Sequence, residues 1–259
     1  MKIPISGMVL TKNSALYLRE CLQALQLLDE VVVCDNGTDR DDTLAIAKSF
    51  ANVTLVETPF IGFGPLRQLA ARHARHDWIL AVDSDEIVTP ELQEELQKLI
   101  LDPGCVYAVL RHNHFAGKRI RCCSWHPDYV VRLFNRRVTD YNANPVHEIV
   151  VVPPTVRVVR LQHPVKHYTS RQVSELVDKM QSYSTLFAKQ HTGRRHGSAP
   201  VAVVRALASF VKDYVLKGGF LQGAEGLLIS VTNANGVFYK YMKLREANRL
   251  AANPSQESP

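Results

Sequence analysis

Two closely spaced aspartates directly follow an apolar run about one third of the way along the chain. Asp83 and Asp85 flank Ser84, and the apolar run covers residues 78–82. In extended backbone, side chains at i and i+2 point to the same side, so both carboxylates can face one cation directly or through water. Carboxylates in this arrangement suit a Mg²⁺ or Mn²⁺ ion that neutralises charge on a departing diphosphate. The alternative is a solvated turn that caps the following helix.

The surrounding pattern predicts the sheet that would position these carboxylates. Residues 1–110 alternate short β-branched runs with amphipathic stretches, which is typical of βαβ units and a mainly parallel sheet. Asp35 then follows the second predicted strand and Asp83 the fourth, at the carboxyl ends where open α/β sheets bind ligands. Strands are predicted at 5–10, 30–34, 53–57 and 78–82, and helices at 14–28, 41–51, 64–75 and 89–101.

The alternation of predicted strands and helices ends near residue 106. Strand-like pieces rich in basic and aromatic residues are predicted at 107–110, 129–134 and 156–161, and helical stretches begin at 170, 200 and 221. The sequence therefore predicts an α/β catalytic domain over residues 1–169, a basic amphipathic helical extension over 170–250 and a disordered tail over 251–259.

Charge is distributed unevenly along the chain, whose formal net charge is +6. Residues 157–249 hold 15 Lys and Arg against 5 Asp and Glu, whereas the remainder holds 16 against 20. A basic C-terminal third favours an anionic partner such as a membrane surface, a phosphorylated glycolipid or nucleic acid, unless it is only a solvated face.

The cysteine content and the distribution of apolar residues predict the cellular compartment and argue against a membrane-spanning segment. The five cysteines are odd in number and lack C-x-x-C spacing, which argues against a zinc site or disulfide framework and favours reduced thiols in the cytosol. No apolar stretch reaches the roughly 20 residues needed to cross a bilayer, and the N-terminus lacks the pattern of a secretory signal.

Three segments resemble, in order and spacing, the opening motifs of family 2 glycosyltransferases. They are MVLTKN at 8–13, VVVCDNGTD at 31–39 and DWILAVDSDE at 77–86. Four more segments resemble the bacterial lipopolysaccharide-core β-1,4-glucosyltransferase group, namely GFGPLRQ at 62–68, PVHE at 145–148, HYTS at 167–170 and GGFLQG at 218–223.

The resemblance implies a fold and an activity. The fold is GT-A, a Rossmann-like and mainly parallel sheet flanked by helices, here with a C-terminal helical extension. The activity is inverting transfer of a hexose, glucose in that group, from a nucleotide sugar such as UDP-glucose to the inner core of lipopolysaccharide or lipooligosaccharide. Mg²⁺ or Mn²⁺ would assist. The enzyme would be cytoplasmic and peripheral at the inner face of the cytoplasmic membrane, with no nucleic acid as partner.

The resemblance also assigns residues to the donor. Asp35 would accept hydrogen bonds from the uracil or ribose, although it could instead cap the turn at Gly37. Arg67, on the first turn of a helix, would contact the diphosphate, because guanidinium groups and helix N-termini both favour anions; the alternative is an exposed arginine that serves solubility. The predicted donor-binding set is Thr11, Asn13, Asp35, Arg67, Asp83 and Ser84.

Inversion requires one carboxylate to take the proton of the acceptor hydroxyl. Glu148 stands where the family carries its acidic base, and Asp128 is the second candidate, since the commoner Glu-Asp pair is absent here. Either carboxylate could instead form a structural salt bridge with Arg132 or Arg136.

The metal set implied by the resemblance is Asp83, Asp85 and His167. His163 is the alternative imidazole, and either histidine could serve only as a hydrogen-bonding side chain. In the C-terminal helices, aromatic and apolar residues interleave with lysines such as Lys212, Lys217, Lys240 and Lys243, which suits docking on an anionic leaflet or packing against the protein itself.

Four other functions compete with this interpretation. The acceptor could be another lipid-linked or surface polysaccharide. A basic nucleic-acid-binding protein is a further alternative, although no recognised nucleic-acid motif occurs. A nucleotidyltransferase would also use paired aspartates, but the glycine-rich, lysine-bearing loop that it would need near the N-terminus is missing. The last alternative is hydrolysis of a nucleotide sugar without an acceptor.

Overall fold

The computed structural model describes residues 2–145 and 147–252, which form two compact units. The first unit comprises Met1–His112 and Asp128–Tyr168, and the second comprises Asn113–Pro127 and Thr169–Pro259. The segment 113–127, which the sequence assigns to the catalytic domain, thus belongs with the C-terminal helices. Within the described residues, every helix is too short or too polar to cross a bilayer.

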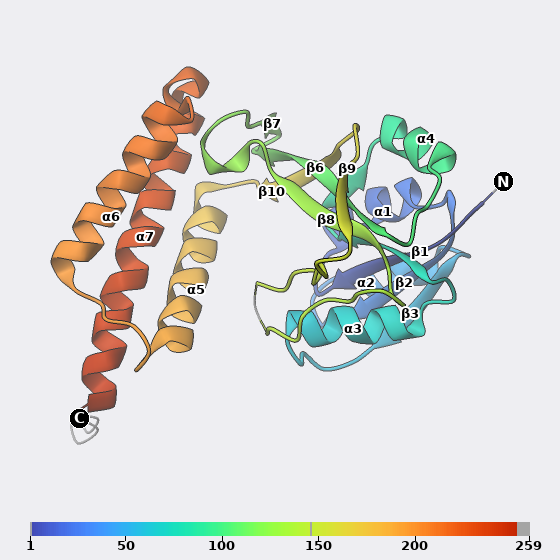
Figure 1. Ribbon diagram of the computed structural model, residues 1–259, viewed down its shortest axis with the longest axis horizontal. Coiled ribbons are helices and arrows are strands. Elements are labelled where there is room, and N and C mark those ends of the chain that lie inside the picture. The colour runs from blue at the N-terminus through green and yellow to red at the C-terminus, as the bar shows by residue number, and fades with distance from the viewer. Residues whose placement is uncertain (1, 146, 253–259) are drawn as a thin grey trace. The chain divides into compact units, whose positions relative to one another are not determined.

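The first unit is organised around a mixed, mainly parallel sheet (Figure 1). The strand order is β3-β2-β1-β4-β8-β6-β10-β5, and β7 and β9 pair with β6. Strands β3, β2, β1 and β4 are parallel, whereas β8 is antiparallel to both of its neighbours. The strands are β1 (Ile3–Thr11), β2 (Leu28–Asp35), β3 (Val53–Glu57), β4 (Trp78–Asp83), β5 (Glu86–Val88), β6 (Cys105–Phe115), β7 (Lys118–Arg119), β8 (Tyr129–Asn135), β9 (Arg157–Arg160) and β10 (Val165–Ser170).

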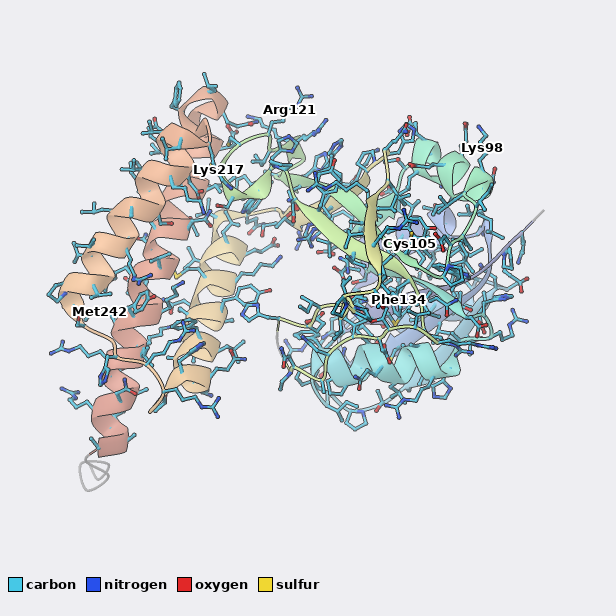
Figure 2. All side chains as sticks on the ribbon, viewed as in Figure 1. Lys98, Cys105, Arg121, Phe134, Lys217 and Met242 are labelled. Atoms are coloured by element: carbon cyan, nitrogen blue, oxygen red, sulfur yellow. The ribbon has the colours of Figure 1, made fainter. Side chains whose placement is uncertain are left out.

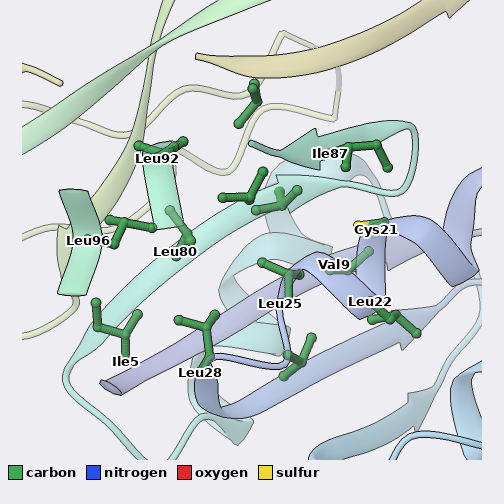
Figure 3. Packing of buried hydrophobic residues seen from close by; sticks show 14 of the residues in the cluster. Ile5, Val9, Cys21, Leu22, Leu25, Leu28, Leu80, Ile87, Leu92 and Leu96 are labelled. Atoms are coloured by element: carbon green, nitrogen blue, oxygen red, sulfur yellow. The ribbon is translucent and has the colours of Figure 1, made fainter. Parts of the chain in front are cut away.

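Helices α1 (Ala15–Ala24), α2 (Thr43–Lys48), α3 (Phe63–His73) and α4 (Pro90–Lys98) cover the sheet. Figure 3 shows apolar side chains of α1 and α4 packed on those of the central strands, among them Leu22, Leu80 and Leu96. A second apolar cluster, on the other face, joins Leu66 of α3 to the sheet. Because both faces are covered, β2 has a continuous apolar run at 31–34 rather than an alternating pattern.

Strand register brings the polar ends of three strands to one edge. Thr11 of β1 pairs with Asp35 of β2, and Leu10 pairs with Asp83 of β4. The carboxyl ends of β1, β2 and β4 therefore lie side by side, as the sequence predicts. The next helix also begins as predicted: α4 starts at Pro90, and the hydroxyl of Thr89 accepts a hydrogen bond from Leu92 N at 3.3 Å.

Several predicted boundaries are wrong. The helix predicted over 14–28 ends at Ala24, because Leu28 already pairs with Ile3 as the first residue of β2. The helix predicted to reach residue 101 ends at Lys98. The short strand β5 was not predicted; it follows the acidic motif directly and pairs antiparallel with β10.

The second unit is mainly helical, and it also contains β7 with the end of β6 that pairs with it. Its helices are α5 (Val173–His191), α6 (Ala199–Val211) and α7 (Gly223–Ala252), and a π-helical turn, Lys212–Leu216, extends α6. Figure 1 shows α7 between α5 and α6, and α7 contacts both. The disordered tail predicted over 251–259 begins too early, since Ala251 and Ala252 still belong to α7; residues 253–259 lie outside the described residues.

A buried carboxylate fastens the segment 113–127 to the helices of the second unit. Asp213 is 1% exposed, and its two oxygens accept hydrogen bonds from Ser124 Oγ and Asn233 Nδ2, both at 2.7 Å. A buried carboxylate with both oxygens satisfied fixes three segments in one geometry. All five cysteines of the chain are buried free thiols.

Candidate active site

Asp83, the last residue of β4, is held between two buried arginines. Its Oδ1 pairs with Nη2 of Arg67, from α3, and its Oδ2 pairs with Nη2 of Arg132, from β8. Burial alone would raise the pKa of Asp83, but the guanidinium groups of Arg132 and Arg67 hold that pKa well below its usual range. Asp83 is therefore ionised throughout the physiological pH range.

Glu86 continues this network into the sheet. The side chain is fully buried; Oε1 lies 2.5 Å from Arg132 Nη2 and 3.6 Å from Arg111 Nη1. Its other oxygen accepts the backbone N–H of Asp83 at 3.0 Å. Arg111 in turn donates to Asp128 Oδ2 from Nη2 at 2.8 Å and from Nε at 2.9 Å. Acidic and basic groups thus alternate from Asp83 to Asp128, which lets several charges be buried together.

Asp85 faces a histidine rather than the arginines. Its Oδ2 lies 3.5 Å from Nε2 of His167, and its carbonyl accepts the N–H of Tyr168 at 2.9 Å. The extended backbone that would point Asp83 and Asp85 to the same side ends at Asp83, since Ser84 and Asp85 form a turn. The two aspartates consequently have different partners.

The pair Asp85 and His167 fits a divalent cation. A carboxylate oxygen and an imidazole nitrogen that converge are suitable ligands for Mn²⁺. No group of three or more His, Cys, Asp or Glu side chains that could hold a metal occurs in residues 2–145 and 147–252. Mg²⁺ and Mn²⁺ sites that act on nucleotides commonly use one or two protein ligands, and phosphate and water supply the others.

Arg67 retains unused hydrogen-bonding capacity. The side chain is 4% exposed, so the interpretation as a solvated surface arginine is wrong. Its Nη1 is buried without a hydrogen-bond partner among the described residues, and its Nε lies 3.8 Å from Oε1 of Glu148. A buried guanidinium with a free N–H is costly unless an anion accepts from it.

The first turn of α3 is engaged by a loop that leads to Glu148. Phe63 N donates to Pro145 O, and Gly64 N donates to Asn144 O, each at 3.0 Å. A Cβ on Gly64 would lie 2.2 Å from Asn142 O, which explains the glycine at this position. Because these helix amides already have acceptors, attraction of an anion here depends on the guanidinium of Arg67 rather than on the helix N-terminus.

Asp35 organises the loop after β2. Its Oδ1 accepts from Thr11 Oγ1 at 2.9 Å and from Thr38 Oγ1 at 2.5 Å, and its Oδ2 accepts from Gly37 N at 3.0 Å. Burial raises the pKa of Asp35, but the hydrogen bonds from Thr38 and Thr11 outweigh burial and lower it. These bonds are the turn cap that the sequence offered as the alternative role; donor binding by Asp35 and Thr11 stays a prediction.

Asn13 joins the loops after β1 and β2. Its backbone adopts a positive φ of 50°, its Oδ1 accepts from the N–H groups of Asp39 and Arg40, and its Nδ2 donates to Asp39. Ser84 Oγ donates to Ser14 Oγ at 3.1 Å. The hydroxyl and amide residues of the predicted donor set thus stabilise the loops at the carboxyl edge of the sheet.

The predicted site residues therefore fall into linked groups within the first unit. Arg67 contacts both Asp83 and Glu148, and Asp85 contacts His167. Asp128 joins the network through Arg111. His163, the alternative imidazole, donates its backbone N–H to Glu95. Arg132, which the sequence offered as a salt-bridge partner of Glu148 or Asp128, instead pairs with Asp83 and Glu86.

Sequence reasoning missed two residues of the network, Glu86 and Arg111. The only local signal was the position of Glu86 directly after the acidic motif and before the apolar pair Ile87 and Val88. An acidic side chain followed by buried apolar residues indicates a strand that enters the core, and a carboxylate there requires a cationic partner.

Comparisons with known proteins identify the family of the chain. The model of the family described as Glycosyl transferase family 2 matches residues 6–152. An uncharacterized glycosyltransferase of Rickettsia bellii (strain RML369-C) is 26% identical over 276 residues, which cover 98% of this chain and 90% of the relative. The lipopolysaccharide core biosynthesis glycosyltransferase LpsC of Rhizobium meliloti (strain 1021) is 25% identical over 268 residues, 98% of this chain and 96% of the relative.

A solved structure supports the fold. The mannosyltransferase PcManGT from Pyrobaculum calidifontis, in complex with GDP-Man and Mn²⁺, matches 100% of this chain and 77% of its own with a TM-score of 0.50 at 16% identity. With the family model covering more than half of its length, the chain belongs to glycosyl transferase family 2 and is a glycosyltransferase of the GT-A fold.

Proposed function

We propose that the chain is an inverting, metal-dependent hexosyltransferase that moves glucose from UDP-glucose to the inner core of lipopolysaccharide or lipooligosaccharide. Similarity to LpsC over nearly the whole of both chains supports an acceptor of this class. The observation that carries the proposal is the juxtaposition of two groups: the pair Asp85 and His167, and the buried Arg67 with an unused N–H.

Charge on the leaving nucleoside diphosphate would be stabilised in two ways. A divalent cation bound by Asp85 and His167 would act as a Lewis acid toward the diphosphate oxygens. Arg67 would donate its free N–H to a phosphate oxygen, as preorganised donors stabilise developing charge in a buried site. Asp83 would hold both Arg67 and Arg132 in place, since its two oxygens accept from them.

Glu148 is the better candidate for the base. Its Oε1 is 3.8 Å from Arg67 Nε, beyond hydrogen-bonding distance, so the carboxylate can accept a proton from an acceptor hydroxyl. It also lies next to the arginine that would bind the leaving group. Asp128 is held by two N–H groups of Arg111, which makes it less available for proton transfer.

The nucleoside would lie over the loops after β1 and β2. Thr11, Asn13 and Asp35 would shape this surface through the hydrogen bonds that connect the two loops, and Ser84 would line the edge toward the diphosphate. The protein would be cytoplasmic and peripheral at the inner face of the cytoplasmic membrane, a location that the basic excess of residues 157–249 supports.

The proposal is tested by isothermal calorimetry with UDP-glucose, UDP-galactose, UDP-N-acetylglucosamine and GDP-mannose in the presence of MnCl₂. We expect UDP-glucose to bind and Asp85→Ala to abolish that binding, whereas Asp178→Ala, at an exposed position of α5, leaves it intact. Transfer is then measured with core-truncated lipopolysaccharide as acceptor. Absence of nucleotide-sugar binding by the parent protein contradicts the proposal, and release of glucose without acceptor indicates hydrolysis instead.

A further inference from the structure

We propose that one face of the second unit docks on the surface of an anionic lipid bilayer. This face, called here the α6 surface, consists of the large apolar side chains on α6 and the two turns that follow it. Its members are Val204, Leu207, Val211, Leu216, Phe220 and Leu221. The inference rests on the proposed function, because it identifies where an enzyme with a lipid-linked acceptor would meet the membrane.

The apolar side chains of the α6 surface are exposed to an unusual degree. Each of the six is between 48% and 79% exposed, and Leu216 and Leu221 are the most exposed among them. Val204, Leu207 and Val211 are spaced i, i+3 and i+7, so they share one side of the helix. Single exposed apolar residues are ordinary, but six large ones on one helix and the two turns that follow it indicate an interaction surface.

The other side of α6 is already used for packing. Ala202 is fully buried, and Asp213 in the turn that extends α6 is 1% exposed and hydrogen-bonded to Asn233 of α7. Figure 1 shows α6 along one side of α7, with α5 along the other. A helix that is apolar on all sides needs a second apolar environment for the side that its own unit does not cover.

The turn after α6 is rigid, so it presents its apolar residues in a fixed direction. Leu221 N donates to Gly218 O at 3.0 Å within the 3₁₀ turn Gly219–Gln222. A Cβ on Gly226 of α7 would lie 1.9 Å from Gly219 O, so this turn packs directly against the start of α7. Phe220 therefore projects from a well-packed turn rather than from a loose loop.

Charge indicates which partner the α6 surface fits. Residues 199–222 contain three exposed cationic residues, Arg205, Lys212 and Lys217. Arg205 lies over the ring of Tyr241 in α7, so Lys212 and Lys217 are the cations that accompany the apolar side chains; Lys217 is labelled in Figure 2. The single acidic residue of this segment, Asp213, is buried and satisfied by hydrogen bonds. Apolar side chains that enter the headgroup region, flanked only by cations, are the arrangement that binds anionic bilayers.

The sequence pattern suggested that Lys240 and Lys243 of α7 could also contact a membrane, but in the structure both lysines have partners within the helical unit. Lys243 Nζ donates to Gln181 Oε1 at 2.7 Å and to Ser184 Oγ at 2.9 Å, so it joins α7 to α5. Lys240 Nζ lies 5.0 Å from the ring of Phe187, and burial together with Arg205 lowers the pKa of Lys240. These lysines stabilise the helical unit and are not membrane contacts.

A second copy of the chain is the competing occupant of the α6 surface. A two-fold interface uses the same patch on both subunits, so Lys212 and Lys217 of one copy would approach the same lysines or Arg205 of the other. Like charges in such an interface oppose association. An anionic bilayer has no such cost, and we therefore assign the surface to lipid.

The test is flotation of the full chain with vesicles of phosphatidylethanolamine and phosphatidylglycerol, and with vesicles of phosphatidylcholine alone. We expect binding to the anionic vesicles. Leu207→Glu/Leu221→Glu is expected to weaken this binding at least about tenfold. The matched control is Ile100→Glu, which adds a carboxylate at a 90% exposed apolar residue of the first unit. Circular dichroism verifies that the variants are folded.

A charge variant separates the electrostatic contribution. Lys212→Gln/Lys217→Gln is expected to weaken binding to anionic vesicles about 30-fold, because each lysine contributes a factor of about five. The control, Lys48→Gln/Lys98→Gln, removes two exposed lysines of the first unit and should leave binding nearly unchanged.

Two results would overturn the docking proposal. One is equal vesicle binding by the parent and the Leu207→Glu/Leu221→Glu variant. The other is a parent dimer, detected by light scattering, that becomes monomeric in that variant, which would assign the surface to a second copy. Calorimetry with UDP-glucose and MnCl₂ on the same variants tests the proposed function separately: intact donor binding without vesicle binding contradicts only the docking proposal, and the reverse contradicts only the donor assignment.

Discussion

Nε2 of His167, in β10, lies 3.5 Å from Oδ2 of Asp85, in the turn after β4. The two residues are 82 positions apart in the chain, and antiparallel pairing of β5 with β10 brings their segments together, with His167 opposite Glu86. Pairing of the two strands therefore positions both ligands proposed for the metal.

His167→Gln is expected to weaken Mn²⁺ binding by the UDP-loaded protein at least about tenfold, because losing a ligand costs no less than losing a residue that supports one. Titration of MnCl₂ into protein with UDP, followed by calorimetry, measures the effect. His163→Gln is the control, since its backbone N–H is bonded to Glu95. Weaker Mn²⁺ binding in the control but not in His167→Gln would transfer the role to His163.

Glu148→Gln is expected to lower kcat by about 10²- to 10⁴-fold, the usual contribution of a general base, with little change in the affinity for UDP-glucose. The amide keeps the shape of the side chain but accepts no proton at neutral pH. Asp128→Asn is the comparison, and single-turnover transfer is the measurement. A larger loss of the chemical step in Asp128→Asn than in Glu148→Gln would exchange the two roles.

Glu86→Ala is expected to destabilise the first unit by about 3–5 kcal/mol, because the buried Arg132 and Arg67 would then share the single carboxylate of Asp83. Urea unfolding measures this change. Glu94→Ala removes an exposed carboxylate paired with Lys98 one helical turn away, and should cost less than about 0.5 kcal/mol. Similar losses in the two variants would mean that the ion-pair network contributes little to stability.

Acid should weaken the fold through Asp83. The pKa of this carboxyl is lowered in the folded chain, so the unfolded chain binds the proton at higher pH. Its contribution to the free energy of unfolding is therefore complete above about pH 4 and declines as the pH falls below that value. Urea unfolding over this range should show a shallower pH dependence for Asp83→Asn than for the parent; an identical slope would contradict the assignment.

The sequence predicts the first four strands and the position of Asp83 because local patterns determine them. An apolar run that ends in polar residues reads as a buried strand with a functional end, and strands β1, β2, β3 and β4 fulfil this expectation with small shifts of their ends. Helix ends were less predictable. The residues after Ala24 are as apolar as a helix face requires, and tertiary pairing of Leu28 decides that they enter a strand.

The ion pairs between the arginines and the carboxylates of Asp83 and Glu86 could not be found from local patterns, although the segment 62–68 had indicated Arg67 as a donor-binding residue. Arg67, Arg111 and Arg132 come from three different elements, and only the folded sheet brings them near one carboxylate or its neighbour. The segment 113–127 illustrates the same limit. Its polar and aromatic residues look like part of an acceptor-binding half, but Ser124 is bonded to Asp213 in the helical unit.

The contacts between the 141–145 loop and α3 would couple donor binding at Arg67 to the position of the proposed base, Glu148. Gln68 Nε2 donates to Tyr141 O at 2.7 Å, which adds to the backbone bonds that the first turn of α3 makes with this loop. The same helix carries Arg67, and the same loop leads to Glu148. A shift of α3 when a donor engages Arg67 would carry the proton acceptor with it, so occupancy by the first substrate would align the group that activates the second.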